Sequence, residues 1–260
     1  TIAYLGIAAD YLPKCVEQLA PSMSADNILR NSYFWLLLCW GVLAAPLSML
    51  RSVGFLGWTS GIAVLAISYT TVIVALHFFG VFDPCSSVPD GEICQGNITP
   101  AIFEFTAIFR SLPIYLTAFC CAPTMFNLYN DMRNPSVKRM DIAASLGLTF
   151  AGVLYAFVAI LGYLTYGDLV QGNVLNSYPI TTPVTIARIG TAFVVIVSYP
   201  LLMHPARDST VHAIQTIAGL ATDTFKDPNN RANVILFYTV AAVLNIGSML
   251  LALLRVDLTI

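Results

Sequence analysis

Residues Ser111 to Arg139 read SLPIYLTAFCCAPTMFNLYNDMRNPSVKR and begin like a membrane-crossing helix. Twenty residues without a charge separate Arg110 from Asp131. At about 1.5 Å per residue, an α-helix of that length crosses the roughly 30 Å hydrocarbon layer of a bilayer. The segment is therefore predicted to enter a membrane.

Two prolines, Pro113 and Pro123, interrupt this apolar segment. Each proline removes a backbone donor and clashes with the carbonyl four residues before it, so a continuous helix through residues 118–122 is strained or broken. A broken helix at membrane depth is tolerated where it is buried in protein or lines a wet cavity, as in the substrate sites of secondary transporters. The plainer alternative is a proline kink in a helix that only packs against its neighbours.

The composition indicates a membrane protein. Hydrophobic residues make up 57% of the chain and charged residues 10%, where a soluble domain has about 25% charged residues. The net charge of −2 and the lack of a basic run give no sign of a nucleic-acid partner. The spans contain no HExxH motif and no paired aspartates, so we predict neither an enzyme nor a metal site.

We predict an all-α, polytopic transmembrane bundle that forms a single transmembrane domain over residues 1–260. Its first apolar segment is too short to cross a bilayer and is expected to end at Pro13. The chain is therefore expected to be a fragment that begins inside a membrane helix. The uncharged segments define one partial span at 1–12 and complete spans at 31–50, 55–79, 107–128, 142–166, 185–203 and 232–254.

A polar loop at residues 80–104 is predicted to face the outside or an organelle lumen. Cys85 and Cys94 lie within it, and Asn97-Ile98-Thr99 is an N-glycosylation sequon. An oxidising compartment allows both a disulfide and a glycan, so the two signals support each other. We predict a Cys85–Cys94 disulfide and glycosylation at Asn97, although two nearby cysteines can also stay reduced.

Basic residues near span ends favour the cytoplasmic side of the membrane. The connection between 107–128 and 142–166 carries three of them, and alternation from the outer loop places it on the same side. His204-Pro205-Ala206-Arg207 is likewise expected to begin a long cytoplasmic connection after span 185–203. The three basic residues of the first connection are Arg133, Lys138 and Arg139.

The polar residues inside the spans are small and neutral, which suits a zwitterion and a monovalent cation whose charges are met by helix ends. The alternative for each of them is a hydrogen bond that joins two helices. Arg110 and Arg188 lie at the outer ends of spans, where they are expected to extend to the interface or to attract a carboxylate. The small polar residues are Thr117, Cys120, Cys121, Thr191, Ser198, Asn245 and Ser248.

Four separated blocks resemble the amino acid/auxin permease family, and in particular its branch of sodium-coupled neutral amino acid transporters. In chain order they are LRSVGFLGWTSG at 50–61, FCCAPTMFNLYNDMRNPSVKRM at 119–140, LGYLTYGD at 161–168 and YPLLMHPARDS at 199–209. The resemblance extends across nearly the whole chain.

The resemblance implies a partial LeuT-type inverted-repeat fold with a broken sixth helix. This chain would supply helices four to nine and the end of helix three. A coupling cation, either sodium or a proton, would lie near Ser198 and Thr191 on helix eight, and no other cofactor is implied. The amino acid substrate would be lined by Thr117, Ala118, Phe119, Cys120 and Ala122.

One position departs from the pattern of the branch. The branch commonly has a histidine where this chain has Ala122, so the proton sensitivity tied to that position is not carried over.

The resulting hypothesis is a cation-coupled transporter of neutral or other small amino acids that works by alternating access. It would lie in the lipid bilayer of the plasma membrane or of an endolysosomal or vacuolar membrane; protein partners are not predicted. On this resemblance, helices one and two and everything after helix nine are expected to lie outside the given sequence. Two alternatives therefore stay open: an amino acid receptor or sensor of the same fold, and an inactive truncated transporter.

Overall fold

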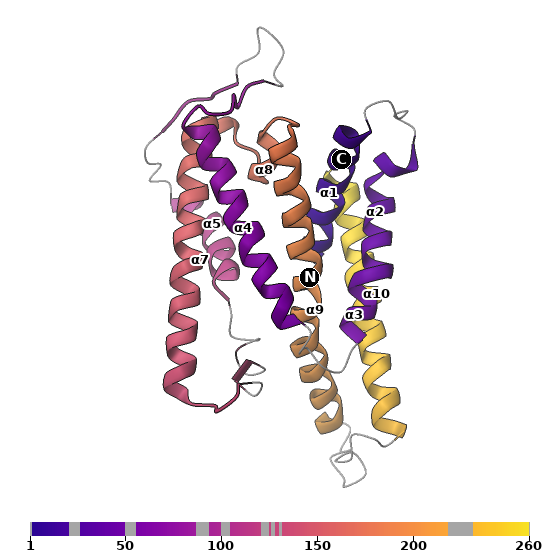
Figure 1. Cartoon of the computed structure of the whole chain (residues 1–260). Helices are drawn as coiled ribbons and strands as arrows, with labels where there is room; N and C mark the ends of the chain where they lie inside the picture. The colour runs from indigo at the N-terminus through magenta and orange to yellow at the C-terminus, as the bar shows by residue number, and fades with distance from the viewer. Residues whose placement is uncertain are drawn as a thin grey trace. The chain divides into compact units, whose positions relative to one another are not determined.

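The chain is helical in a computed structural model that describes residues 2–20, 27–49, 56–86, 94–99, 105–120, 125, 128–129, 132–217 and 231–259 (Figure 1). Within these residues, five helices are long and apolar enough to cross a membrane. The expected all-α membrane architecture is therefore confirmed, whereas the LeuT-type arrangement stays a prediction. The five helices cover Ser32–Met49, Trp58–Phe78, Val137–Leu169, Thr182–Ile217 and Arg231–Leu254.

The chain divides into two compact units. Unit 1 comprises Thr1–Val64 and Ile189–Ile260, and unit 2 comprises Leu65–Arg188. Two helices, α4 (Leu56–Phe78) and α9 (Thr182–Ile217), each contribute one end to either unit.

Unit 1 packs α1 (Ile2–Leu19) against α2 (Ser32–Leu38) and α10 (Arg231–Thr259). A short 3₁₀ turn, η1 (Ile28–Arg30), precedes α2. Burial of apolar side chains from these helices and from α9 supplies the main stabilisation of the unit. One buried cluster consists of Leu5, Ala9, Leu36, Ala44, Tyr199, Met203 and Ala252.

One span of unit 1 changes its helical winding in the middle. Between α2 and α3 (Ala45–Met49) lies the π-helix η2 (Cys39–Ala44), where the N–H of Ala45 donates to the carbonyl of Trp40, five residues earlier. The next residue, Pro46, has no N–H, and its ring would clash with a carbonyl of a regular α-helix. The wider π turn accommodates this proline without ending the span.

Two expected boundaries, a helix end at Pro13 and a connection that begins at His204, are wrong. Pro13 lies inside α1, where an ion pair joins Lys14 Nζ to Asp10 Oδ1 at 3.2 Å. Pro205 lies inside α9, which continues past His204 instead of giving way to a connection there. A proline deletes one backbone hydrogen bond and bends the helix, and the packing of the flanking turns outweighs that cost.

The buried side chains of unit 2 lie mainly at one end of its helices. Apart from Met140 near the start of α7, its buried side chains lie near the C-terminal ends of α4 and α7 and in the residues that follow α7, and His77 of α4 packs edge-on against Tyr178 with 4.8 Å between ring centres. The apolar window of the α7 span, by contrast, has no buried residue. Besides part of α4 and the start of α9, the unit contains α5 (Phe105–Ala118), α7 (Val137–Tyr166), η3 (Gly167–Leu169) and α8 (Val174–Ser177).

Candidate functional site

Helix α5 ends at Ala118, within the segment where the sequence predicts an interruption. The N–H of Phe119 still bonds the carbonyl of Tyr115 at 3.1 Å, and the N–H of Cys120 bonds the carbonyl of Thr117 at 3.3 Å. The second of these bonds reaches back three residues, which is the tightening usual at a helix end. Phe119 and Cys120 are not helical, so the apolar segment does not continue through them as one helix.

The polar groups at this end of α5 are exposed within unit 2. Thr117, Ala118 and Cys120 are all exposed, whereas Ala122 lies outside the described residues. The hydroxyl of Thr117 donates to the carbonyl of Pro113 at 2.8 Å, which leaves its oxygen lone pairs available. The C-terminal end of a helix carries partial negative charge and carbonyls without intrahelical partners. Such an end suits an ammonium group or a monovalent cation.

Phe119 holds the end of α5 against α7. Its ring meets that of Tyr155 edge-on, with 5.7 Å between centres. It also lies over Gly152, where an added Cβ would be 3.6 Å from the ring. Aromatic pairs of this geometry contribute about 0.5–1.5 kcal/mol beyond their buried area. The proposed contact of Phe119 with substrate stays a prediction.

The two expected cation-site residues lie in the other unit. Thr191 and Ser198 are both half-buried on the part of α9 that belongs to unit 1. Seven residues separate them, so they share one face of the helix, two turns apart. Hydroxyl oxygens are suitable ligands for a hard monovalent cation, but the role of these two residues stays a prediction.

The described part of the loop at residues 80–104 is bonded to the end of α7. Cys85 and Cys94 form the expected disulfide, with 5.7 Å between Cα atoms. The N–H of Asn97 donates to Asp168 Oδ1 at 2.9 Å, and the N–H of Asp168 donates back to the carbonyl of Asn97 at 3.2 Å. Asn97 itself is exposed, and its glycosylation stays a prediction.

Two glycines allow the loop to approach this closely. A Cβ on Gly96 would collide with the carboxylate of Asp168. Gly167 has φ +63°, and a Cβ there would lie 2.6 Å from the carbonyl oxygen of Gly96. A residue with a side chain at either position would therefore displace the loop.

The interface position expected for Arg188 is wrong. The residue is 1% exposed, and its guanidinium donates to the carbonyl of Leu175 at 3.0 Å and to that of Tyr178 at 2.8 Å. These carbonyls lie at the C-terminal end of α8, where a cation is favoured. Burial raises the pKa of Tyr178 to about 12, so its phenol stays protonated at physiological pH. The side chain of Arg110 lies outside the described residues.

Arg207 is also buried, in unit 1, although the sequence indicated a solvated connection there. It is 4% exposed and donates to the carbonyl of Ser48 at 3.1 Å and to His204 Nδ1 at 2.8 Å. Its Nε lies 3.1 Å from Asp208 Oδ1, and its guanidinium stacks over Phe237 at 3.9 Å from the ring centre. Arginine has no acceptor, so His204 accepts through Nδ1 and carries its own proton on Nε2.

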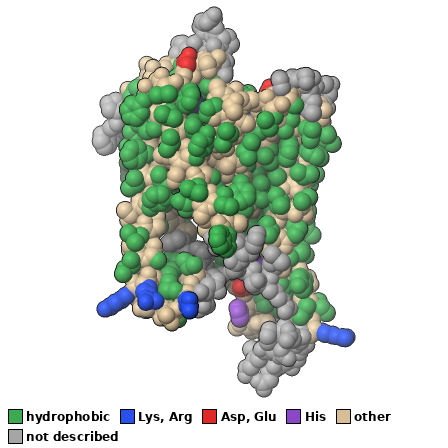
Figure 2. Space-filling model, in the orientation of Figure 1, with side chains coloured by type: hydrophobic (Ala, Val, Ile, Leu, Met, Phe, Trp, Pro, Cys, Tyr) green, Lys and Arg blue, Asp and Glu red, His purple; other side chains and the backbone are tan. Residues whose placement is uncertain are grey.

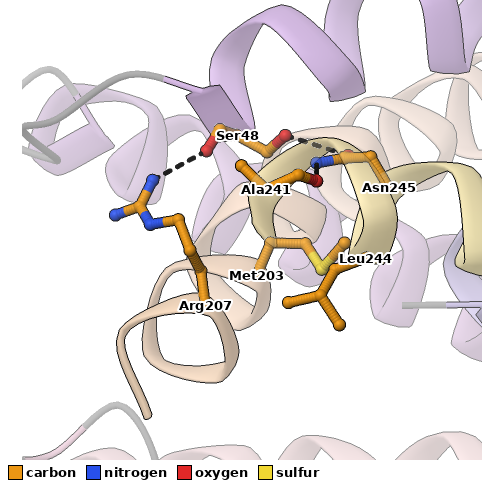
Figure 3. A pocket seen from close by; sticks show the side chains of 6 residues that line it. All are labelled: Ser48, Met203, Arg207, Ala241, Leu244 and Asn245. Carbon is orange, nitrogen blue, oxygen red and sulfur yellow. Dashed lines mark hydrogen bonds between the residues drawn. The ribbon is translucent and has the colours of Figure 1, made fainter. Parts of the chain in front are cut away.

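Arg207 also borders a network of hydrogen bonds that joins three helices. Asn245 Oδ1 accepts from the hydroxyls of Ser48 and Tyr199, each at 3.0 Å, and Tyr199 contacts the hydroxyl of Ser248 at 2.7 Å. Through these hydrogen bonds Asn245 and Ser248 join helices, which is the alternative that the sequence left open for them. A narrow recess lies beside this network, and Figure 3 shows the side chains that line it. The recess is lined by Ser48, Met203, Arg207, Ala241, Leu244 and Asn245.

A sequence signal for this buried face does exist. Tyr199, Met203 and Arg207 recur at four-residue intervals, which is the spacing of one helix face, and all three are buried. The sequence was interpreted instead as a span that ends at Met203, followed by a connection that begins at His204.

Comparison with known proteins identifies the family. A family model described as transmembrane amino acid transporter protein matches residues 1–259. Vacuolar amino acid transporter 6 of Saccharomyces cerevisiae is 28% identical, covering 84% of this chain and 47% of the relative. Vacuolar amino acid transporter 5 of Schizosaccharomyces pombe is 32% identical, covering 82% and 48%. Human sodium-coupled neutral amino acid transporter 7 is 29% identical, covering 77% and 42%.

The chain spans about half the length of these curated relatives. No solved structure matches it. The family match across almost every residue, together with the membrane-crossing helices, identifies an integral, multi-pass membrane protein and excludes the enzyme class. The chain belongs to the transmembrane amino acid transporter family, the amino acid/auxin permeases.

Proposed function

We propose that this chain is the central part of a secondary transporter that moves neutral or other small amino acids, coupled to sodium or protons, by alternating access. The observation that carries the proposal is the end of α5 at Ala118, inside an apolar segment that would otherwise cross the bilayer. The family match supports it, and so do the relatives, which are named as amino acid transporters. The vacuolar membrane is the proposed location, on the strength of the yeast relatives.

In this proposal the exposed end of α5 binds the substrate. The carbonyls of its last turn and the hydroxyl oxygen of Thr117 would accept hydrogen bonds from the substrate ammonium group. Cys120, exposed just beyond the helix, would limit the size of the substrate side chain. The discontinuous helix supplies these groups without a buried ionic partner, as in other transporters with broken helices.

The coupling cation is proposed to bind at α9. Ser198 and Thr191 would each replace one oxygen of the cation's hydration shell. Their common face on the helix places the two hydroxyls on the same side.

Uptake by the complete protein in proteoliposomes tests the proposal. A panel of radiolabelled neutral amino acids is supplied with an inward sodium gradient, an inward proton gradient or neither. Accumulation that depends on one gradient supports cation-coupled transport. Stoichiometric binding with no accumulation under any gradient would reject transport and favour the sensor.

Two matched pairs of variants test the proposed residues. Ser198→Ala is expected to raise the half-saturating cation concentration about tenfold, by analogy with the loss of one hydrogen bond to a charged group. Ser209→Ala, an exposed serine on the same helix, should leave the titration unchanged. Cys120→Trp should raise KM for substrate while Cys120→Ala should not. Equal kinetics for the two members of a pair would remove that residue from its site.

A further inference from the structure

The turn that leads into α7 carries three exposed basic side chains. Arg133, Lys138 and Arg139 are all exposed, and none of them forms an ion pair with a described residue. Residues 131–141 contain these three basic residues and two acidic ones, Asp131 and Asp141, which leaves a net charge of +1 in the sequence. The segment therefore has an excess of positive charge that the described part of the chain does not neutralise.

This placement of cations does not stabilise α7. Lys138 and Arg139 occupy its first turn, where the helix dipole is positive and basic side chains are disfavoured. The N-cap residue, Ser136, makes no side-chain bond to the first turn. An anionic group would be attracted by both the side chains and the helix end.

An exposed apolar stripe continues along α7 from these cations. Lys138, Ile142 and Leu146 are spaced four residues apart and so follow one face of the helix. The stripe extends over further turns, and Figure 2 shows basic side chains gathered where Figure 1 places the start of α7, with hydrophobic side chains above them. The exposed stripe consists of Ile142, Leu146, Phe150, Val153, Phe157 and Ile160.

We propose that the turn at residues 132–139 binds the phosphate headgroup of an anionic phospholipid whose acyl chains lie along the α7 stripe. Cations above a membrane-facing apolar surface match the two parts of such a lipid, whereas inorganic phosphate would use the cations alone. A general preference for basic residues on one side of the membrane requires charge but no headgroup contact. The inference needs only that α7 lies in the membrane, so it does not depend on the proposed transport.

Binding to the protein purified in a neutral detergent tests the lipid itself. Three probes separate the contribution of the anionic headgroup from that of the acyl chains: dioctanoyl phosphatidic acid, dioctanoyl phosphatidylcholine and inorganic phosphate. The proposal expects saturable binding of phosphatidic acid, at least tenfold weaker binding of phosphatidylcholine, and weaker binding of inorganic phosphate than of phosphatidic acid. Phosphatidylcholine binding as tightly would reject the headgroup contact, and inorganic phosphate binding as tightly would identify a free-anion site instead.

Charge-neutralising variants test the location. Each of Arg133→Gln, Lys138→Gln and Arg139→Gln is expected to weaken phosphatidic acid binding about fivefold, since one basic residue near a membrane surface contributes about 1 kcal/mol. Arg231→Gln, at the exposed start of α10, is the control of equal charge change and should have no effect. Asp141→Asn should tighten binding slightly. Unchanged binding in all three glutamine variants, each checked for an unaltered unfolding temperature, would overturn the proposal.

Discussion

Unit 1 and unit 2 arrange their small polar groups in opposite ways. In unit 1, Ser48, Tyr199 and Asn245 are buried and hydrogen-bonded to one another across three helices. In unit 2, Thr117 and Cys120 at the end of α5 are exposed within the unit. Polar groups that satisfy one another stabilise a fixed packing, whereas polar groups left exposed beside a broken helix are available to a ligand. The contrast separates a structural network from a candidate binding site.

The largest effect is expected from removing the buried guanidinium of Arg207 in unit 1. Arg207→Met should lower the free energy of unfolding by about 3 kcal/mol, because the carbonyl of Ser48 and Nδ1 of His204 would lose a charged donor while buried. Thermal or denaturant unfolding in detergent measures the change. Arg231→Met, at an exposed position, is the control. Equal stability of the two variants would show that the network of unit 1 is not what stabilises it.

A second variant tests whether the contact between residues 96–97 and the end of α7 stabilises unit 2. Gly167→Ala should cost about 2 kcal/mol, because a positive φ disfavours alanine and its Cβ would meet the backbone of Gly96. The control is Gly172→Ala, where no atom lies within 4 Å of the new Cβ. If both variants unfold at the same temperature, the contact of residues 96–97 with the end of α7 contributes no stability.

A smaller loss is expected from a single hydroxyl of the unit 1 network. Tyr199→Phe should destabilise the protein by about 1 kcal/mol, since Asn245 keeps its bond from Ser48 but the Ser248 contact is lost. Unfolding midpoints measure it, and uptake by the variant should keep its wild-type KM. A large rise in KM with normal stability would place this network in the substrate pathway and remove the contrast between the units.

The smallest change in stability is expected at the end of α5. Thr117→Val preserves shape and should alter unfolding by no more than about 0.5 kcal/mol, yet it should lower the affinity for substrate in uptake assays. Thr210→Val is matched, because the hydroxyl of Thr210 makes the same bond to the carbonyl four residues earlier, at 2.7 Å. Substrate affinities that change equally in the two variants would show that the local helical bond, not a ligand contact, is responsible.

Much of the helical framework and one covalent link followed from the sequence. Uncharged segments long enough to cross a bilayer identified the membrane helices, and the interruption predicted at residues 118–122 agrees with the end of α5 at Ala118. Pro113 itself lies inside α5, and Pro123 lies outside the described residues. Cys85 and Cys94 were paired correctly because they share a short polar loop with a sequon. In each case the signal is local, so a single sequence is sufficient to read it.

The errors came from features that depend on packing. Pro13 was predicted to end a helix and His204 to begin a connection, but α1 continues through Pro13 and α9 continues through Pro205. Arg188 and Arg207 looked solvated because charge normally stays near water, yet each donates to carbonyls at the end of a short helix. The acceptor of Arg207 could not be assigned before the fold was known, since Ser48 lies far from it in the chain.

The accessibility of Cys120 to a small water-soluble thiol reagent tests the central claim most directly. The measurement uses the complete protein with Cys121 replaced by Ser, so that Cys120 can be followed alone beside the buried thiols of Cys15 and Cys39. If the open end of α5 is the substrate site, Cys120 should react in membranes, and a transported amino acid should slow the reaction in proportion to its occupancy. A Cys120 that does not react, or that reacts at the same rate with and without saturating amino acid, would contradict the account.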